Sequence, residues 1–344
     1  MFNPDIFKLN QNNIYLFLIC LLFIFAFTLQ SNFFVFIVIF SLLAGSLKAP
    51  FHLAIFFVAA LFLTLVDFDT FKNFILLVVS IILLSVTFSE KIYDVLKIYS
   101  YIFLFFIICV LFTSEPKYGS FQEIFLFQQR LWLVLPDGRE FNPNPLGLIC
   151  SLVAFGFLIN RNYIFMSLPL FLLLLTQSRA AILFFLIAFI IFQRVKAKNI
   201  IISFLVLIPF VYIILTSPLM DRFSEDGENG RIDRILVYSD ALRNNYILGY
   251  PIPYYDEMIK VYGTLDNMYL LLILNYGLIG IFFLIYMIFM FLLNGKDEFY
   301  RVRLSLFIPF LVYGIFEGGI VNNYLTWIIF SMCFSGFNKN ILRV

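Results

Sequence analysis

Apolar residues occur in long runs along almost the whole chain, with short polar segments between them. A helix that crosses the hydrocarbon core of a bilayer needs about 20 predominantly apolar residues, and some runs here are short enough to form tilted pairs or helical hairpins. The pattern therefore predicts an all-α polytopic membrane protein with about 12 transmembrane helices, in a single membrane domain over residues 1–344. The apolar runs lie at about residues 14–29, 32–47, 51–66, 71–89, 98–113, 145–159, 163–178, 180–193, 200–216, 268–292, 302–316 and 319–337.

The composition excludes a water-soluble globular domain and a disordered chain. Of the 344 residues, 62% are hydrophobic and 13% are charged, and the mean hydropathy is +0.99. A soluble domain has roughly half apolar and about a quarter charged residues. The formal net charge of +2 supplies no broad basic surface, so we expect no nucleic-acid partner.

Residues that commonly bind metals are sparse. The single histidine, His52, cannot build a histidine cluster and is expected at the membrane interface. The four cysteines lie in or beside apolar runs without CxxC spacing, so packing against lipid or core explains them better than a metal site or a disulfide framework. We therefore expect neither a metal nor another cofactor. The cysteines are Cys20, Cys109, Cys150 and Cys333.

Lysine and arginine are distributed unevenly between the two sides of the predicted membrane domain. With a cytoplasmic N-terminus, the short segments on the inner side carry 13 basic residues and those on the outer side carry 2. Because basic residues accumulate in short cytoplasmic loops, both termini are predicted to be cytoplasmic. The two longer loops, residues 114–142 and 217–267, then face outward. Since polar sequence is scarce elsewhere, the chemistry or recognition is expected on that face.

The larger outward loop, residues 217–267, carries five cations and nine anions. With this negative balance, its arginines must act as individually placed groups and not as a broad positive field. Residues 231–242 have helical periodicity, which predicts a helix in this loop. One apolar stripe of that helix comprises Ile232, Ile235, Leu236 and Leu242.

Another face of the same helix carries Arg231, Arg234 and Tyr238, at positions i, i+3 and i+7. Two guanidinium groups on one face suit a diphosphate, because each is permanently charged and can bind phosphate oxygens bidentately. Ion pairing on a solvated helix explains the same spacing, with Asp233 or Glu228 as the partner. The spacing alone leaves both interpretations open.

Two further charged residues stand at predicted outer turns. Arg179 lies between two apolar runs, where a cation is costly unless it has a partner, although it could also extend to lipid headgroups. Glu317 lies at the outer turn between the last two predicted spans. It could pair with an arginine or act as a base.

The smaller outward loop, residues 114–142, divides into two parts. In the first part, apolar side chains lie opposite a polar face that includes Arg130, which is the pattern of a helix in the membrane interface. Residues 136–138 (Pro-Asp-Gly) then predict a turn that suits a short hairpin, and residues 142–145 (Asn-Pro-Asn-Pro) stop any helix before the chain re-enters the bilayer. The apolar face comprises Phe121, Ile124, Phe125, Leu131 and Trp132.

Three separated blocks in residues 115–335 resemble the O-antigen ligase and polymerase superfamily of bacterial surface polysaccharide assembly. Residues 141–147 (Phe-Asn-Pro-Asn-Pro-Leu-Gly) are similar to the family's Phe-x-Asn-Pro-Asn entry into a membrane helix, and residues 177–181 (Gln-Ser-Arg-Ala-Ala) to its Ser-Arg-Ala turn. The third block resembles the family's arginine, aromatic and Ala-Leu helix, its Gly turn, and its Asn-x-Tyr/Leu segment followed by Gly-x-x-Gly. This block comprises Arg234, Tyr238 and residues 241–242, 248–250, 266–270 and 276–280.

One position departs from the ligase branch of the family. Ligases of the superfamily typically have a histidine just before the Asn that ends the large loop, whereas Asp266 occupies this position here. The only histidine, His52, is predicted on the cytoplasmic side. The departure favours the polymerase branch.

The resemblance implies an O-antigen polymerase in the bacterial inner membrane. This enzyme is a metal-independent glycosyltransferase of lipopolysaccharide biosynthesis, and it joins undecaprenyl-diphosphate-linked oligosaccharide repeat units at the periplasmic face. The partners that the resemblance implies are the lipid-linked substrate and the bilayer, and a chain-length regulator is an optional further partner. The alternatives are an O-antigen ligase that transfers the polysaccharide to lipid A-core, and a lipid-linked sugar transporter or flippase. We find no convincing internal repeat, which a transporter commonly has.

The same resemblance assigns roles to eight residues. Because charge develops on the leaving diphosphate, fixed arginines can stabilise it, and we expect Arg179 and Arg234, assisted by Arg231, to hold it. Asp266 is the expected catalytic group that orients or deprotonates the acceptor hydroxyl, with Glu317 as the alternative. The expected substrate-positioning residues are Asn267, Tyr250 and Arg130.

Overall fold

The computed structural model describes residues 92–193, 231–293 and 299–318, parts of 61–78, and residues 18, 329, 331 and 332. Four of the predicted spans fall almost entirely outside these residues, and two others are covered only in part. His52 also lies outside the described residues. The spans concerned are those at 14–29, 32–47, 200–216 and 319–337, and in part those at 51–66 and 71–89.

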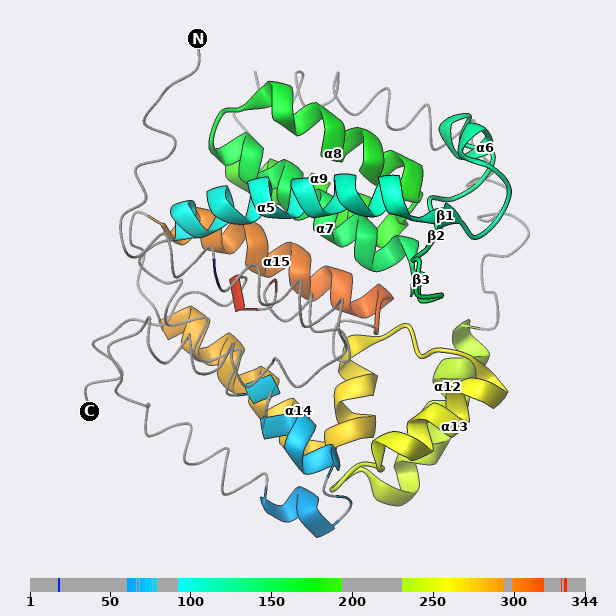
Figure 1. The fold of residues 1–344 in the computed structure, drawn as a ribbon. Coiled ribbons are helices and arrows are strands. Elements are labelled where there is room, and N and C mark those ends of the chain that lie inside the picture. Colours follow the sequence, from blue (N-terminus) through cyan, green and yellow to red (C-terminus); the bar gives the residue numbers. More distant parts are fainter. Residues whose placement is uncertain are drawn as a thin grey trace.

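Five helices pack into one bundle, in which α7 contacts α5, α8 and α9, and α15 lies along α9 (Figure 1). The helices form because each sequence is an apolar run without proline beyond its first turn, except for one proline in α8 and one in α15. Their buried side chains make up most of the hydrophobic core. The five helices are α5 (Ile92–Thr113), α7 (Pro143–Ile159), α8 (Tyr163–Thr176), α9 (Arg179–Gln193) and α15 (Tyr300–Phe316).

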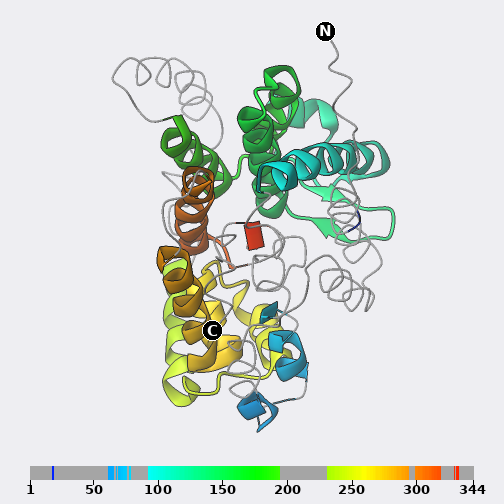
Figure 2. The same ribbon diagram turned by 90° about the vertical axis from the view of Figure 1, so that its left-hand side faces the viewer.

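A second group of helices packs beside this bundle, and α15 joins the two groups (Figure 2). It consists of α12 (Arg231–Asn245), α13 (Ile252–Tyr262) and α14 (Met268–Leu293), with α12 and α13 both against α14. The rings of Phe291 and Phe307 stack at 3.9 Å where α14 meets α15.

α14 is broken at Gly277, where φ is 60° and ψ is −150°, and it changes direction there (Figure 1). The turn after α12 occupies the break, because the Leu278 N–H donates to the Ile247 carbonyl at 3.1 Å and the Tyr250 N–H donates to the Leu274 carbonyl at 2.7 Å. A Cβ at Gly277 would lie 2.1 Å from the Ile247 oxygen. Only glycine fits this position, since it tolerates both the positive φ and the close approach.

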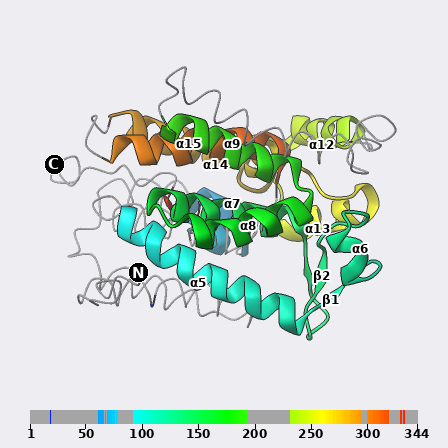
Figure 3. The same ribbon diagram turned by 90° about the horizontal axis from the view of Figure 1, so that it is seen from above.

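A short helix and a small sheet follow α5 and project beyond its end (Figure 3). Helix α6 (Phe121–Phe125) begins with a capping box between Ser120 and Glu123. Strands β1 (Glu115–Pro116), β2 (Leu133–Val134) and β3 (Glu140–Phe141) pair antiparallel in the order β1-β2-β3.

The β2–β3 pairing confirms the predicted hairpin around residues 136–138. The three-stranded sheet itself was not part of the predicted all-α fold. α6 spans only five residues, so the expected continuation of its apolar face at Leu131 and Trp132 lies in the extended segment that leads into β2.

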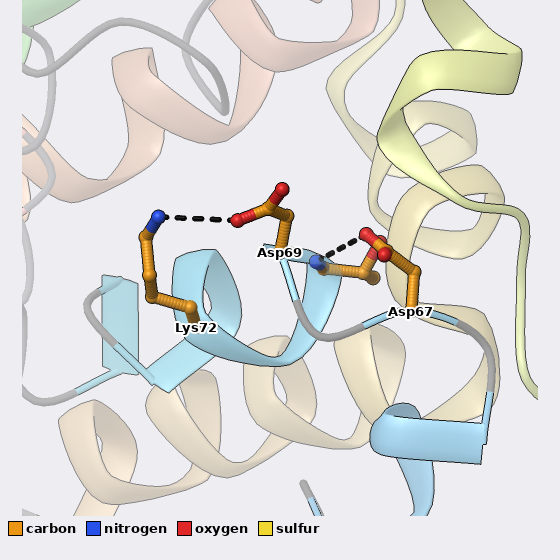
Figure 4. A network of polar contacts seen from close by, with 4 residues as sticks. Asp67, Asp69 and Lys72 are labelled. Carbon is orange, nitrogen blue, oxygen red and sulfur yellow. Dashed lines mark hydrogen bonds and ion pairs between the residues drawn. The ribbon is translucent and has the colours of Figure 1, made fainter.

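The turn before residues 69–75 shows how a short polar segment begins a helix in an apolar sequence (Figure 4). Asp67 caps the helix, since its Oδ2 accepts from the Thr70 N–H at 3.0 Å and from the Thr70 hydroxyl at 3.3 Å. Lys72 pairs with Asp69 at 3.1 Å on the exposed side. The helix packs against α14, where the Phe74 ring lies 5.0 Å from that of Tyr276.

Six predicted spans coincide with helices of the structure, which confirms the mostly helical fold but not the number of about 12 transmembrane helices. Among the described residues, Ile92–Thr113 and Met268–Phe289 are long and apolar enough to cross a membrane. The break at Gly277 divides the second, and its straight part, residues 278–293, is about 24 Å long. The six spans are those at 98–113, 145–159, 163–178, 180–193, 268–292 and 302–316.

The helix bundle has two distinguishable ends. At one end, here called the loop end, α5, α8 and α15 finish and α7, α9 and α14 begin. At the other end, here called the opposite end, the Tyr93 ring lies 5.4 Å from that of Phe299, and Arg301 Nε donates to the Ile191 carbonyl at 3.3 Å. The smaller loop of the sequence analysis, residues 114–142, therefore starts and finishes at the loop end, and the described part of the larger loop leads into α14 there.

Candidate functional site

The turn between α8 and α9 is fixed from inside the protein. Gln177 adopts a left-handed conformation (φ 49°, ψ 30°) that ends α8, and its amide donates to the Phe127 carbonyl at 3.0 Å. The Ser178 hydroxyl accepts from the Ala181 N–H at 3.4 Å and so caps α9. Gln177 and Ser178 are both buried. The turn that presents Arg179 is thus held in one conformation.

The start of α7 lies directly against this turn. Asn142 caps α7 by accepting from the Asn144 N–H at 2.9 Å. A Cβ at Gly147 would lie 2.9 Å from the Thr176 hydroxyl, and Ser151 donates to the Ala181 carbonyl at 2.8 Å. The first two sequence blocks of the resemblance, residues 141–147 and 177–181, therefore pack against each other.

Arg130 joins these two segments to the smaller loop. Its Nε donates to the Thr176 carbonyl at 3.1 Å, and its Nη2 donates to Asn144 Oδ1 at 2.7 Å. The Leu131 N–H donates to the Leu175 carbonyl at 2.8 Å, which holds the backbone beside it. The guanidinium is therefore fixed between the ends of α7 and α8.

The segment that precedes α14 packs on the end of α15. Asn267 caps α14 by accepting from the Leu270 N–H at 3.0 Å, and its amide donates to the Ile315 carbonyl at 3.1 Å. A Cβ at Gly318 would lie 1.9 Å from the Leu265 oxygen, so the two backbones touch there. This contact places Asp266 and Glu317 in neighbouring segments.

Arg234 of α12 and Asp266 form an ion pair, with Nη2 and Oδ2 separated by 3.5 Å. The two side chains are 24% and 22% exposed, so the pair is partly shielded from solvent. The stem of Arg234 lies over Gly263, where an added Cβ would be 3.5 Å from the Arg234 Cδ. The structure therefore brings together the expected diphosphate-binding arginine and the expected base.

Tyr313 of α15 lies between the Arg130–Asn144 contact and the segments that carry Asp266 and Glu317. The sequence analysis did not identify it. Its buried hydroxyl donates to the Asn144 carbonyl at 3.1 Å. Arg130, Asp266 and Glu317 all lie close enough to act electrostatically on this hydroxyl. The one available signal in the sequence is that Tyr313 lies four residues before Glu317.

Glu317 follows the last residue of α15 and is 9% exposed. Its backbone is extended (φ −142°, ψ 123°), which turns the chain toward Leu265 and Asn267. A buried carboxylate is costly without polar partners, and the nearby Tyr313 and Asn267 segments provide a polar environment.

For Arg179 and Arg231, the positions on their helices are what can be described. Arg179 is the first residue of α9 and is exposed, three residues after Thr176, to which Arg130 is bonded. Arg231 is the first residue of α12, one turn before Arg234, and its side chain lies outside the described residues. Arg179 thus belongs to the same end of the bundle as Arg130.

One protein-family model matches the part of the chain that contains most of this site. Residues 164–285 match the family model described as O-Antigen ligase. The match confirms the resemblance to the O-antigen ligase and polymerase superfamily. Nothing matches among the curated proteins or among the solved structures.

Proteins of this superfamily are membrane proteins with a glycosyltransferase-like ligase or polymerase function in surface polysaccharide biosynthesis. The matched range includes most of the expected site residues, namely Arg179, Arg231, Arg234, Tyr250, Asp266 and Asn267. Outside it lie the other two expected residues, Arg130 and Glu317, together with Asn144 and Tyr313, which the structure adds.

The tyrosines of the superfamily-like third block hold α12 and α13 together. The Tyr238 hydroxyl donates to the Gly263 carbonyl at 2.8 Å, and the Tyr255 hydroxyl accepts from the Leu265 N–H at 3.4 Å. Burial raises the pKa of Tyr238 and Tyr255, so both stay neutral near pH 7. Tyr238 is fully buried, and the charge of Arg234 acts on its hydroxyl.

Tyr250, an expected substrate-positioning residue, also has a structural partner. Its hydroxyl donates to the Ala241 carbonyl at 2.7 Å, and its ring stacks on that of Tyr254 at 4.5 Å. The Tyr254 ring is 37% exposed and covers one face of Tyr250. The expected apolar stripe of α12 is correct at Leu242, which is buried, and wrong at Leu236, which is 57% exposed.

Proposed function

We propose that the protein is an O-antigen polymerase, a glycosyltransferase that joins undecaprenyl-diphosphate-linked oligosaccharide repeat units at the periplasmic face of the bacterial inner membrane. The observation that carries the proposal is the Arg234–Asp266 ion pair, held at the loop end beside Glu317 and Tyr313. It combines a cation for the leaving diphosphate with two carboxylates for the acceptor.

The reaction transfers the growing saccharide from its lipid carrier to a new repeat unit. The acceptor hydroxyl oxygen attacks the anomeric carbon of the donor, and the bond from that carbon to the diphosphate oxygen breaks. The diphosphate leaves with the electron pair, and the hydroxyl proton passes to a carboxylate. That carboxylate loses its charge as the diphosphate gains charge, so the neighbouring guanidinium then faces the leaving group.

The site residues divide between these two halves of the reaction. Asp266 is the proposed base and Glu317 its alternative, since both lie near Tyr313. Arg234 is the proposed diphosphate ligand with Arg179 and Arg231, while Asn267 fixes the Asp266 backbone and Arg130 positions substrate. Guanidinium groups supply the positive charge in this proposal, so it requires no metal. Among the described residues, no three His, Cys, Asp or Glu side chains form a group that could hold a metal ion.

A polymerase is preferred to a ligase because of Asp266. The superfamily resemblance places a ligase histidine at this position, and the carboxylate here pairs directly with Arg234. An O-antigen ligase remains the second candidate, because the matched family model carries that description. Both enzymes use a lipid-linked polysaccharide donor, so they differ in the acceptor.

The proposed orientation places the loop end in the periplasm and both termini in the cytoplasm. The opposite end supports it, because Arg161, Arg301 and Arg303 lie there, and basic residues favour the cytoplasmic side. The proposed partners are the lipid-linked oligosaccharide and the bilayer, with a chain-length regulator as a further one.

The experiment that tests the function is a lipopolysaccharide gel from a strain in which the gene is deleted and then restored. A polymerase predicts loss of the ladder, with a single repeat unit still attached to the core, and recovery on restoration. Loss of every O-antigen band with polymer accumulating on the carrier would establish a ligase. An unchanged ladder would contradict both enzymes and direct attention to transport.

A further inference from the structure

Asn144 connects two residues that are far apart in the sequence. Its side-chain Oδ1 accepts from Arg130 Nη2 at 2.7 Å, and its backbone carbonyl accepts from the Tyr313 hydroxyl at 3.1 Å. A hydrogen bond that involves a charged group is shorter and stronger than a neutral one, which fits the first of these distances. Asn144 therefore links the Arg130 guanidinium to Tyr313.

Tyr313 is well suited to act as a fixed point. Its side chain is buried, and its ring meets that of Phe184 edge to face at 6.4 Å between α15 and α9. The helices α9 and α15 pack along each other. The hydroxyl therefore has little freedom to follow movements of the smaller loop.

The charges around this hydroxyl have a complementary arrangement. Arg130 approaches from the smaller loop, Asp266 from the start of α14 with its partner Arg234, and Glu317 from the end of α15. A guanidinium has five donors in a planar fork, and the bonds to Thr176 and Asn144 fix that plane.

We propose that Tyr313 is a positioning residue that acts through Asn144 to set the Arg130 guanidinium as a further diphosphate-binding group, in addition to Arg234. The inference rests on the proposed function, because its ligand is the diphosphate of the lipid carrier. A guanidinium held in a fixed plane can bind phosphate oxygens bidentately. Arg130 then contacts the leaving group, and Asn144 and Tyr313 hold it in place.

The test uses the full-length protein purified in detergent and undecaprenyl diphosphate as the probe. Affinity is measured from the increase in unfolding temperature with probe concentration. Tyr313→Phe removes one hydroxyl and keeps the ring, and it is expected to weaken binding about tenfold, the effect of misplacing one charged hydrogen-bonding group.

Tyr101→Phe is the matched control. The Tyr101 hydroxyl also takes part in a hydrogen bond between elements, since it accepts from the Asn162 amide at 3.1 Å at the opposite end, and its ring also meets phenylalanines edge to face. Both variants are expected to lower the unfolding temperature without probe to a similar extent. Only Tyr313→Phe is expected to change the affinity for undecaprenyl diphosphate.

A double variant separates positioning from general destabilisation. Arg130→Lys keeps the charge but loses the fixed plane, so it is expected to weaken binding about as much as Tyr313→Phe. If Tyr313 acts through Arg130, the double variant binds no more weakly than either single variant. Additive losses, equal affinities for Tyr313→Phe and Tyr101→Phe, or no binding by the wild type would overturn the inference. None of these results depends on whether the strain makes a polymer ladder, which tests the proposed function separately.

Discussion

The two ends of the helix bundle both carry arginine, but the surroundings of those arginines differ. At the opposite end, Arg301 donates to a carbonyl of α9 and lies 6.0 Å from the centre of the Phe192 ring. At the loop end, Arg234 pairs with Asp266, and Arg130 is bonded to Asn144 beside Tyr313. The first arrangement anchors a helix end, and the second collects cations, carboxylates and a hydroxyl from several elements.

The difference shows that basic residues alone do not mark a site in a membrane protein. A cation at the opposite end fits the proposed cytoplasmic side through its position relative to the bilayer. The cations described at the loop end lie among several polar and charged groups from different elements, which is what charge stabilisation in a reaction requires. Substitutions that separate these two roles are the means to test the comparison.

The largest effect is expected from Arg234→Ala. It removes the proposed diphosphate ligand and leaves Asp266 without its 3.5 Å partner, so polymer formation should fall about 10³-fold, or about 4 kcal/mol in the activation barrier. Arg243→Ala is the control, since Arg243 lies on the same helix in an exposed ion pair with Asp240 and should leave the ladder unchanged. A normal ladder with Arg234→Ala at wild-type abundance would contradict the comparison.

Substitutions of the two carboxylates, Asp266 and Glu317, are expected to differ in their effect, with a loss of about 10²-fold in the reaction rate for the one that acts as the base. Asp266→Asn and Glu317→Gln each keep the size of the side chain and remove its ability to accept the proton. The variant of the true base should lose this factor in the turnover number with little change in KM, and the other should lose clearly less. Polymerisation kinetics with purified lipid-linked repeat units provide the measurement. Equal, small losses from both would mean that neither carboxylate takes the proton.

Arg179→Ala is expected to have a smaller effect, of about tenfold. Arg179 is exposed at the start of α9, so water screens its charge more than that of Arg234. The loss should appear in the affinity for the lipid-linked donor and should diminish further at high salt. A salt-independent loss as large as that of Arg234→Ala would show that Arg179 becomes enclosed when substrate binds.

Much of the fold could be predicted from the sequence because continuous apolar runs indicate membrane helices. Residues 145–159 and 163–178 were predicted within a few residues of α7 and α8. The sequence did not predict the break in α14, although Gly277 belongs to the third block of the family resemblance. A glycine in an apolar run does not reveal that another backbone, here at Ile247, will occupy its missing side chain.

The candidate site could be predicted in part. Arg234 and Asp266 were chosen separately, from helical spacing and from a family position, and the structure joins them. Tyr313 was missed because its role depends on Asn144, which lies 169 residues away in the sequence. Periodicity within one helix carries no information about such a partner.

The smallest effect is expected from Asp137→Asn, which tests whether any ion pair at the loop end matters. Hydrogen bonds from Arg139 lower the pKa of Asp137, but the carboxylate is exposed in the β2–β3 turn. A lowered pKa stabilises the folded state above the ordinary Asp pKa of about 3.9, and this contribution disappears as the pH falls through the folded value. The variant should therefore unfold at nearly the wild-type temperature at pH 7, any small difference should diminish as the pH falls below the ordinary Asp pKa, and its ladder should be normal. A marked loss of polymer would mean that exposed charge at the loop end, and not the convergence around Tyr313, determines activity.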